Sequence, residues 1–164
     1  MKSSASRFAR PVFASMLALG TLLALPFAPT ASLAAASAEA GSALWTEDFA
    51  AASAKAAASK RPLLLDFTGS DWCGWCVKLD KEVFEKSEFQ SFSTKHLELV
   101  KLDFPKSKPQ TDAVKAQNAS LKEKYQVRGY PTLVLLSPEG KELKRWVGFK
   151  PAFLSELKQA VEKP

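Results

Sequence analysis

The chain has 164 residues, of which 46% are hydrophobic and 24% charged, and it carries a formal net charge of +6. The first 38 residues hold three of the 23 basic residues and none of the 17 acidic ones, so a protein without them carries a net charge of +3. Because basic and acidic residues are interleaved in the remainder, the charge excludes a nucleic-acid-binding surface and indicates an ordinary solvated one. The length is sufficient for one domain with a hydrophobic core and too short for two.

The N-terminal segment has the pattern of a secretory signal. Basic residues at positions 2, 7 and 10 precede an apolar stretch over residues 12–25, and Ala36-Ser37-Ala38 provides a cleavage site of small residues. The apolar stretch is shorter than the roughly 20 residues of a membrane-spanning helix. We therefore expect export to a bacterial periplasm or the extracellular space, cleavage after Ala38, and a single domain over residues 39–164. An uncleaved N-terminal anchor is the alternative.

The first half of this domain predicts a helix, a strand and two further helices. Residues 44–60 are rich in alanine and favour a helix that starts near Thr46 and is broken by the proline that follows it. Residues 63–67 form a short apolar run after that proline, which is typical of a buried strand. Residues 77–86 contain no glycine or proline and have apolar residues at helical spacing, and a shorter helix is expected over residues 87–94.

The second half predicts alternating strands and helices, followed by a hairpin and a closing helix. Residues 132–136 are wholly apolar, which suits a central strand covered on both faces. Ser137-Pro138-Glu139-Gly140 has the composition of a turn, so the segment after it should be a hairpin partner. The expected elements are strand 97–104, helix 111–125 with a break near Asn118 as an alternative, strand 132–136, strand 142–147, and helix 152–161 with Pro151 in its first turn.

The only two cysteines, Cys73 and Cys76, fall between the strand 63–67 and the helix after it. A helix N-terminus favours the thiolate form of the first cysteine. A purely structural disulfide across so short a loop would stabilise the fold by only roughly 2 kcal/mol. Zinc would need two more Cys or His ligands, whereas the chain has one histidine, His96, expected at the surface. The pair therefore indicates thiol chemistry, and in an exported protein, where disulfides persist, it implies a redox partner.

Three separated segments of the chain resemble the thioredoxin superfamily. They are the strand that contains Asp66, the motif Trp72-Cys73-Gly74-Trp75-Cys76, and the segment Gly129-Tyr130-Pro131-Thr132 before an apolar strand. A Cys-x-x-Cys pair alone is a weak signal, but its combination with the other two segments is specific. The resemblance covers residues 44–161 and implies an α/β fold, a thioredoxin-like three-layer α/β/α sandwich with a central mixed sheet.

The resemblance also implies roles for individual residues in disulfide exchange. Cys73 is expected to be the exposed nucleophile and Cys76 the more buried resolving thiol. Asp66 matches a buried acid of raised pKa that relays the proton of the resolving thiol, although it could instead be a satisfied polar group at a strand end. Pro131 matches a cis-proline that faces the disulfide. Tyr130, before that proline, is expected to contact substrate.

Trp72 and Trp75 are expected to bind substrate beside the cysteines, with a mere hydrophobic collar as the alternative. Superfamily members have redox potentials from about −270 mV for a reductant to about −120 mV for an oxidant. The resemblance does not place this chain within that range, because Gly74-Trp75 stands where ordinary thioredoxin has Gly-Pro.

We expect an exported, monomeric thiol–disulfide oxidoreductase that reduces disulfide-containing protein substrates through Cys73 and Cys76. It should need no cofactor beyond that dithiol, bind no metal and no nucleic acid, and receive electrons from a membrane donor. The retained Asp66 favours reduction, because it serves deprotonation of the resolving thiol. The alternatives are a disulfide oxidase, or a redox-inert or copper-binding interaction module in which the two cysteines are soft ligands.

Overall fold

The computed structural model of the chain describes residues 44–163. The expected signal sequence and its cleavage site after Ala38 lie outside the described residues. None of the helices within residues 44–163 has the length and apolar character needed to cross a membrane.

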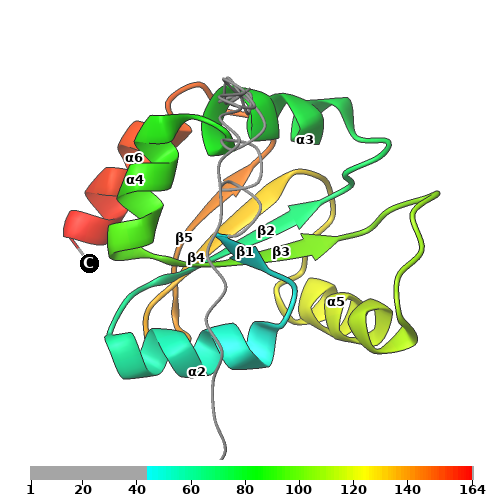
Figure 1. The fold of residues 1–164 in the computed structure, drawn as a ribbon, viewed down its shortest axis with the longest axis horizontal. Coiled ribbons are helices and arrows are strands. Elements are labelled where there is room, and N and C mark those ends of the chain that lie inside the picture. The colour runs from blue at the N-terminus through cyan, green and yellow to red at the C-terminus, as the bar shows by residue number, and fades with distance from the viewer. Residues whose placement is uncertain (1–43, 164) are drawn as a thin grey trace, which may run out of the picture. The chain divides into compact units, whose positions relative to one another are not determined.

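Within the described residues, five strands form a mixed sheet at the centre of the fold (Figure 1). β3 lies parallel to both β1 and β2, whereas β4 lies antiparallel to β2 and β5. All residues of β2 and β4 are buried, as expected for apolar strands covered on both faces. In spatial order, the strands are β1 (Trp45–Thr46), β3 (Glu98–Asp103), β2 (Leu63–Thr68), β4 (Thr132–Leu136) and β5 (Glu142–Val147).

Helices cover both faces of this sheet. The helices are α2 (Phe49–Ser59), α3 (Gly74–Leu79), the π-helix η1 (Asp80–Phe84), α4 (Ser87–His96), α5 (Asp112–Lys124) and α6 (Phe153–Glu162). Figure 1 shows α2 and α5 on one face and α3, α4 and α6 on the other. The predicted three-layer α/β/α sandwich with a central mixed sheet is therefore confirmed.

The alternation of β2 decides which side of the sheet Asp66 faces. Successive side chains of a strand point to opposite faces. Leu63, Leu65 and Phe67 belong to the core beneath α2 and α5, whereas Leu64 belongs to the core beneath α3, α4 and α6. Asp66 is two residues from Leu64 and so faces the side of the sheet that carries α3. The acid and the cysteine helix therefore lie on the same face.

The start of the domain differs from the single helix predicted over residues 44–60. Trp45 and Thr46 form the edge strand β1, which pairs in parallel with β3. The helix begins at Phe49, because Asp48 is its N-cap and accepts a hydrogen bond from the Ala51 N–H at 2.9 Å. Thr46 instead accepts a hydrogen bond from the Asp48 N–H at 3.1 Å. A strand of two residues is too short to leave a periodic pattern in the sequence.

Two helix starts depart from the predictions, and α5 is the continuous helix that was predicted, without the alternative break. The cysteine helix starts at Gly74 rather than Val77 and continues as the π-helix η1. α5 is unbroken at Asn118, because that side chain is buried and donates to the Asp103 carbonyl at 2.9 Å instead of competing for its own helix backbone. Pro151 precedes the last helix, whose N-cap is Ala152.

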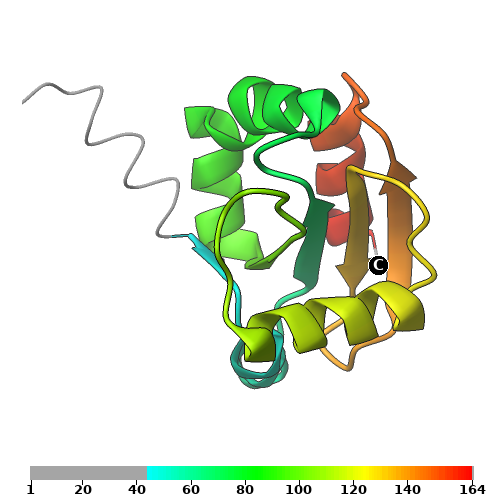
Figure 2. The ribbon, with the colours of Figure 1, turned by 90° about the vertical axis from the view of Figure 1, so that its right-hand side faces the viewer.

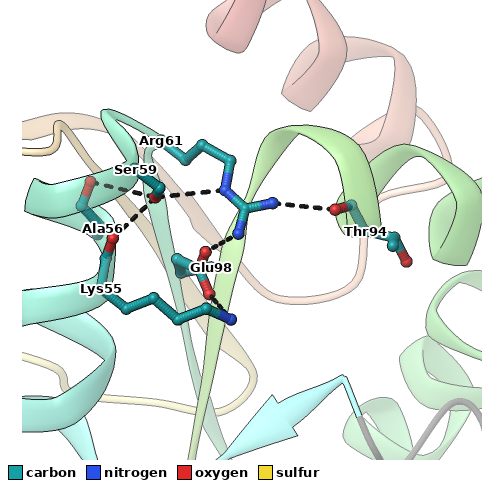
Figure 3. A network of polar contacts seen from close by, with 6 residues as sticks. All are labelled: Lys55, Ala56, Ser59, Arg61, Thr94 and Glu98. Carbon is teal, nitrogen blue, oxygen red and sulfur yellow. Dashed lines mark hydrogen bonds and ion pairs between the residues drawn. The ribbon is translucent and has the colours of Figure 1, made fainter.

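A buried carboxylate joins α2, β3 and α4 at the end of the sheet where β2 begins (Figure 3). Glu98 is 6% exposed and pairs with Lys55 at 2.8 Å and with Arg61. Arg61 also donates to the Thr94 carbonyl at 3.0 Å. Since β2 leads away from this network toward the cysteines, the network secures the end of the sheet opposite to them. Figure 2 looks onto the cysteine end, from which loops lead to α3 and α5.

Candidate active site

Cys73 and Cys76 form a disulfide at the junction of β2 and α3. Cys73 is the N-cap of α3, and its Sγ accepts a hydrogen bond from the Cys76 N–H at 3.2 Å. A donor aimed at this sulfur favours its thiolate form once the disulfide is reduced. The expected order of accessibility holds, since Cys73 is 7% exposed and Cys76 1%. The expectation of an openly exposed Cys73 was wrong, because neighbouring residues cover most of it.

Asp66 is a buried acid without a full set of partners. Its side chain is 1% exposed, and Oδ1 accepts no hydrogen bond from the described residues. Desolvation raises the pKa of Asp66 to about 8, against a smaller lowering by the charge of Lys101. The unpaired Oδ1 and the raised pKa favour the buried acid over a satisfied polar group at a strand end.

Lys101 is the cation that acts on Asp66 from the neighbouring strand. Its Nζ lies 3.2 Å from one carboxylate oxygen of Asp80 and 3.4 Å from the other. Both side chains are about one quarter exposed, at 26% for Lys101 and 24% for Asp80. The negative charges of Asp80 and Asp103 raise the pKa of Asp66 further, after desolvation and Lys101.

Pro131 follows a cis peptide bond from Tyr130, which confirms the geometry implied by the resemblance. Pro131 is buried, and its carbonyl accepts a hydrogen bond from the Gly148 N–H at 2.8 Å. The Thr132 hydroxyl donates to the Gly129 carbonyl at 2.8 Å and closes the same loop. The loop before β4 is thereby held to the loop after β5.

Trp72 is 41% exposed, and hydrogen bonds and ring contacts fix its position. Its Nε1 donates to the Phe104 carbonyl at 2.8 Å, and its ring meets Tyr130 edge-on at 5.6 Å between centroids. Phe104 lies 5.2 Å from Tyr130, so the three rings form one cluster. A Cβ at Gly69 would lie 2.5 Å from the Trp72 ring, so only glycine leaves room for the indole there.

Trp75 is 59% exposed and belongs to a second group of side chains. Its ring stacks on Phe149 with centroids 6.2 Å apart, and the Nζ of Lys78 lies 5.4 Å from the Trp75 ring and 5.0 Å from the Phe149 ring. The carboxylate partner of Lys78 is Glu82, at 3.7 Å. Trp75 and Lys78 lie three residues apart on one helix, and this spacing could have predicted the contact between the lysine and the Trp75 ring.

Asp71 ties the cysteine loop to the loop after β3. Its carboxylate accepts hydrogen bonds from the backbone N–H groups of Lys106, Ser107 and Lys108 at 3.0, 2.7 and 3.2 Å. These bonds lower the pKa of Asp71 below its ordinary value. Ser70 makes a parallel connection, donating its N–H and hydroxyl to Asp103 at 2.8 and 2.6 Å.

Within residues 44–163, no group of three or more His, Cys, Asp and Glu side chains could hold a metal ion. His96 is exposed as the last residue of α4, where it stacks on Phe92. Sequence reasoning missed Phe104 and Phe149. Phe104 directly follows β3, and the cysteine loop directly follows β2. Because these two strands are parallel neighbours, they end at the same edge of the sheet, and this could have placed Phe104 near the cysteines. No sequence signal indicates Phe149.

Comparisons with known proteins agree with this geometry. A family model described as a thioredoxin-like domain matches residues 49–163. The disulfide bond reductase DsbH of Chlamydia pneumoniae is 39% identical over 120 residues, which cover 71% of this chain and 72% of that protein. The thioredoxin-related protein DsbJ of the same organism is 36% identical over 127 residues, or 77% of this chain but only 36% of that protein.

Solved structures share the same architecture. A structure of DsbH oxidoreductase superposes with a TM-score of 0.68 at 38% identity, covering 73% of this chain and 85% of that one. A thioredoxin from Thermus thermophilus superposes with a TM-score of 0.55 at 24% identity, over 70% of this chain and 84% of that one, which is evidence for the fold alone.

Proposed function

Because the chain belongs to the thioredoxin-like family, we propose that it reduces protein disulfides through its Cys73–Cys76 pair. The chain is a thiol–disulfide oxidoreductase by its homology, and the reducing direction is the proposal. The observation that carries this direction is the 39% identity to the disulfide bond reductase DsbH. The buried, incompletely paired Asp66, on the sheet face that carries the cysteine helix and with its pKa raised to about 8, supplies the acid–base group for the exchange. An acid of that pKa can take up the proton of a resolving thiol near neutral pH.

The reaction runs in two exchanges. The Cys73 thiolate attacks one sulfur of the substrate disulfide, forms a mixed disulfide with it, and releases the other substrate sulfur as a thiolate that takes a proton from water. Asp66 accepts the proton of Cys76, whose thiolate then attacks the Cys73 sulfur. The new Cys73–Cys76 bond displaces the second substrate thiolate, so two electrons pass from the protein to the substrate.

The surrounding residues position the substrate. In this proposal Pro131, after the cis peptide bond from Tyr130, faces the cysteines, and Tyr130 contacts the substrate. Trp72 and Trp75 are exposed on either side of Cys73 in the sequence and offer apolar surface to a substrate chain. We assign these four residues a binding role and the two cysteines and Asp66 the chemistry.

The setting that fits this reaction is outside the cytosol. The N-terminal signal pattern would export a monomer over residues 39–164, and an exported dithiol needs a continuing supply of electrons. We therefore propose that a membrane protein with a reducing dithiol restores the reduced form after each cycle. Mass spectrometry of the protein recovered from a bacterial periplasm tests the export step, with an N-terminus at Glu39 as the expected result.

Insulin reduction by dithiothreitol tests the proposed activity. Wild type should accelerate the appearance of turbidity, whereas Cys73→Ser should give the rate of dithiothreitol alone. After removal of dithiothreitol, reduced Cys76→Ser should instead accumulate a mixed disulfide with insulin, because the variant lacks the thiol that resolves it. Equal rates for wild type and Cys73→Ser would reject the activity, and a mixed disulfide that forms only on Cys76 would reverse the two roles.

A further inference from the structure

Aromatic rings and lysines form two sets beside the disulfide. The first, here called the proline-side set, consists of Trp72, Phe104, Tyr130, Lys106 and Lys122. Lys106 Nζ lies 4.6 Å from the centre of the Trp72 ring, and Lys122 Nζ lies 5.5 Å from the Phe104 ring and 5.4 Å from the Tyr130 ring. These distances are within the range of cation–π attraction.

The second set, here called the helix-side set, consists of Trp75, Phe149 and Lys78. The two rings are nearly parallel, with an interplanar angle of 13°, and the Lys78 ammonium lies over both. Each set thus combines an apolar surface with a positive charge held at its face.

Both sets include residues adjacent in the chain to the cysteines or to the loop that contains Pro131. In the first set, Trp72 directly precedes Cys73 and Tyr130 directly precedes Pro131. In the second, Trp75 lies between the two cysteines, and Phe149 follows the residue whose N–H bonds to the Pro131 carbonyl. Both sets therefore include residues next to the cysteines in the chain, where a substrate segment bound at the disulfide can contact them.

The charges of these lysines are available to an incoming partner. Among residues 44–163, neither Lys106 nor Lys122 takes part in an ion pair. Lys78 has only Glu82, at 3.7 Å, with both side chains about half exposed. The carboxylate of Asp71 accepts hydrogen bonds from three backbone N–H groups, and among residues 44–163 it forms no ion pair with a lysine side chain.

We propose that the two sets select substrates whose disulfide is flanked by acidic residues. This inference rests on the proposed function and names its substrate class: an extended segment with an apolar residue and aspartate or glutamate next to the reactive cysteine. The rings contact the apolar part of that segment, and the lysines pair with the carboxylates. Exposed ion pairs are weak individually, so the selection acts as a several-fold preference carried by three lysines together.

Two disulfide peptides of equal length test the preference. One carries glutamate and the other lysine at the positions flanking each cysteine, with all other residues identical. The measured quantity is kcat/KM for each peptide, divided by its rate with dithiothreitol alone, because flanking charges also alter the intrinsic reactivity of a disulfide. We expect wild type to favour the glutamate peptide about threefold to tenfold at low ionic strength. The ratio should approach one at roughly 0.5 M salt, where charges are screened over a few ångströms.

Lysine variants locate the effect. The triple variant Lys78→Gln, Lys106→Gln, Lys122→Gln should lose the preference, and Lys106→Gln alone should reduce it. The matched control is Lys158→Gln, which removes a lysine that also lies over an aromatic ring, Phe92 at 5.7 Å, and pairs with Glu88 outside the two sets. This control should keep the wild-type ratio.

The outcomes separate the two proposals. Equal normalised rates of wild type on the two peptides at low salt, or a preference that survives in the triple variant, would overturn the selection by acidic neighbours. A wild type that reduces neither peptide faster than dithiothreitol alone would reject the proposed reductase activity instead. The peptide comparison uses wild type, so it decides the first question even where the triple variant does not fold.

Discussion

Asp66 has a pKa suited to exchange a proton with a thiol. An ordinary cysteine has a pKa of about 8.5, and the raised pKa of Asp66, about 8, lies close to it. A proton then moves between the two groups at a small cost in free energy, in either direction. An aspartate of ordinary pKa would be a far weaker base toward the same thiol. Burial of Asp66 on β2 therefore raises its pKa into the range in which it can exchange a proton with a thiol.

The same burial makes the stability of the oxidised protein depend on pH. Because the folded state binds this proton more tightly than the unfolded chain, the stabilisation is fully present below pH about 4 and is lost as the pH rises to about 8. Asp66→Asn removes the dependence. We expect the variant to gain on the order of 3 kcal/mol in free energy of unfolding, relative to wild type, between pH 5 and pH 8. Denaturant unfolding of the oxidised proteins at four pH values measures this.

Activity supplies the second measurement on this variant. Insulin reduction by Asp66→Asn should be slower than by wild type near neutral pH, because the resolving thiol loses its base. The control is Asp112→Asn, since the Asp112 side chain is fully exposed, at 101%. Parallel stability curves for Asp66→Asn and wild type across the pH range would show that Asp66 is not the group responsible.

At the scale of single residues, sequence motifs predicted the cis bond before Pro131, and they located Cys73, Cys76 and Asp66, to which we assign the chemistry. Short sequence patterns, which can be recognised without knowledge of the fold, contain Cys73, Cys76, Asp66 and Pro131. The partners Phe104 and Phe149 could not be predicted in the same way, because they reach the site from loops distant in the chain. Their contacts depend on strand order and register, which a local pattern does not contain.

The loops at the cysteine end of the sheet act as one unit. Asp71 binds three consecutive N–H groups of the loop after β3, and Trp72 binds the Phe104 carbonyl of the same loop. At the opposite end, Glu98 joins α2, β3 and α4 through Lys55 and Arg61. The rigid sheet between these two connections holds the disulfide against its flanking rings.

Asp71→Ala should release the loop at residues 106–108. Because the folded-state pKa of Asp71 is lowered, its stabilisation is present above the ordinary value of 3.8 and is lost as the pH falls below it. Hydrogen exchange should therefore show faster exchange of these three amides in the variant at neutral pH, with slower insulin reduction as Trp72 loses its support. Glu88→Ala, which removes a carboxylate paired with Lys158, is the control and should leave the three amides protected. Unchanged protection in Asp71→Ala would show that the loop is held by other contacts.

Elements were predictable where their pattern was local and long enough. Strand 132–136 was predicted with its observed bounds, because a short apolar run before a turn with proline and glycine is typical of a buried strand. The two-residue strand β1 was missed, because the pairing with β3 that defines it involves residues far along the chain. The π-helix η1 was missed for a related reason, since its hydrogen-bond register has no simple sequence pattern.

At the scale of the whole molecule, the direction of electron flow is a question of relative stability. The potential of a disulfide in a folded protein depends on how much more stable the fold is with the bond than without it. Strong oxidants of this superfamily have a stabilised reduced form. The disulfide restricts the unfolded chain and so stabilises the oxidised form at pH 7. Above pH about 8, an ionised Asp66 also disfavours a second negative charge on the sulfur pair, which weakens the reduced thiolate form.

We therefore expect the oxidised protein to be the more stable form, by roughly 1–3 kcal/mol in free energy of unfolding at pH 7. A potential nearer −270 mV than −120 mV should accompany this difference, since about 30 mV corresponds to 1.4 kcal/mol for a two-electron couple. Denaturant unfolding with and without excess dithiothreitol measures the first quantity, and equilibration with a glutathione or dithiothreitol buffer the second. If the reduced form has the higher free energy of unfolding and the potential lies near −120 mV, the chain is a disulfide oxidase and not a reductase. Measured at about pH 9, where the wild-type Asp66 is ionised, Asp66→Asn should show a higher potential than wild type, because the variant no longer places a negative charge on the sheet face that carries the cysteine helix.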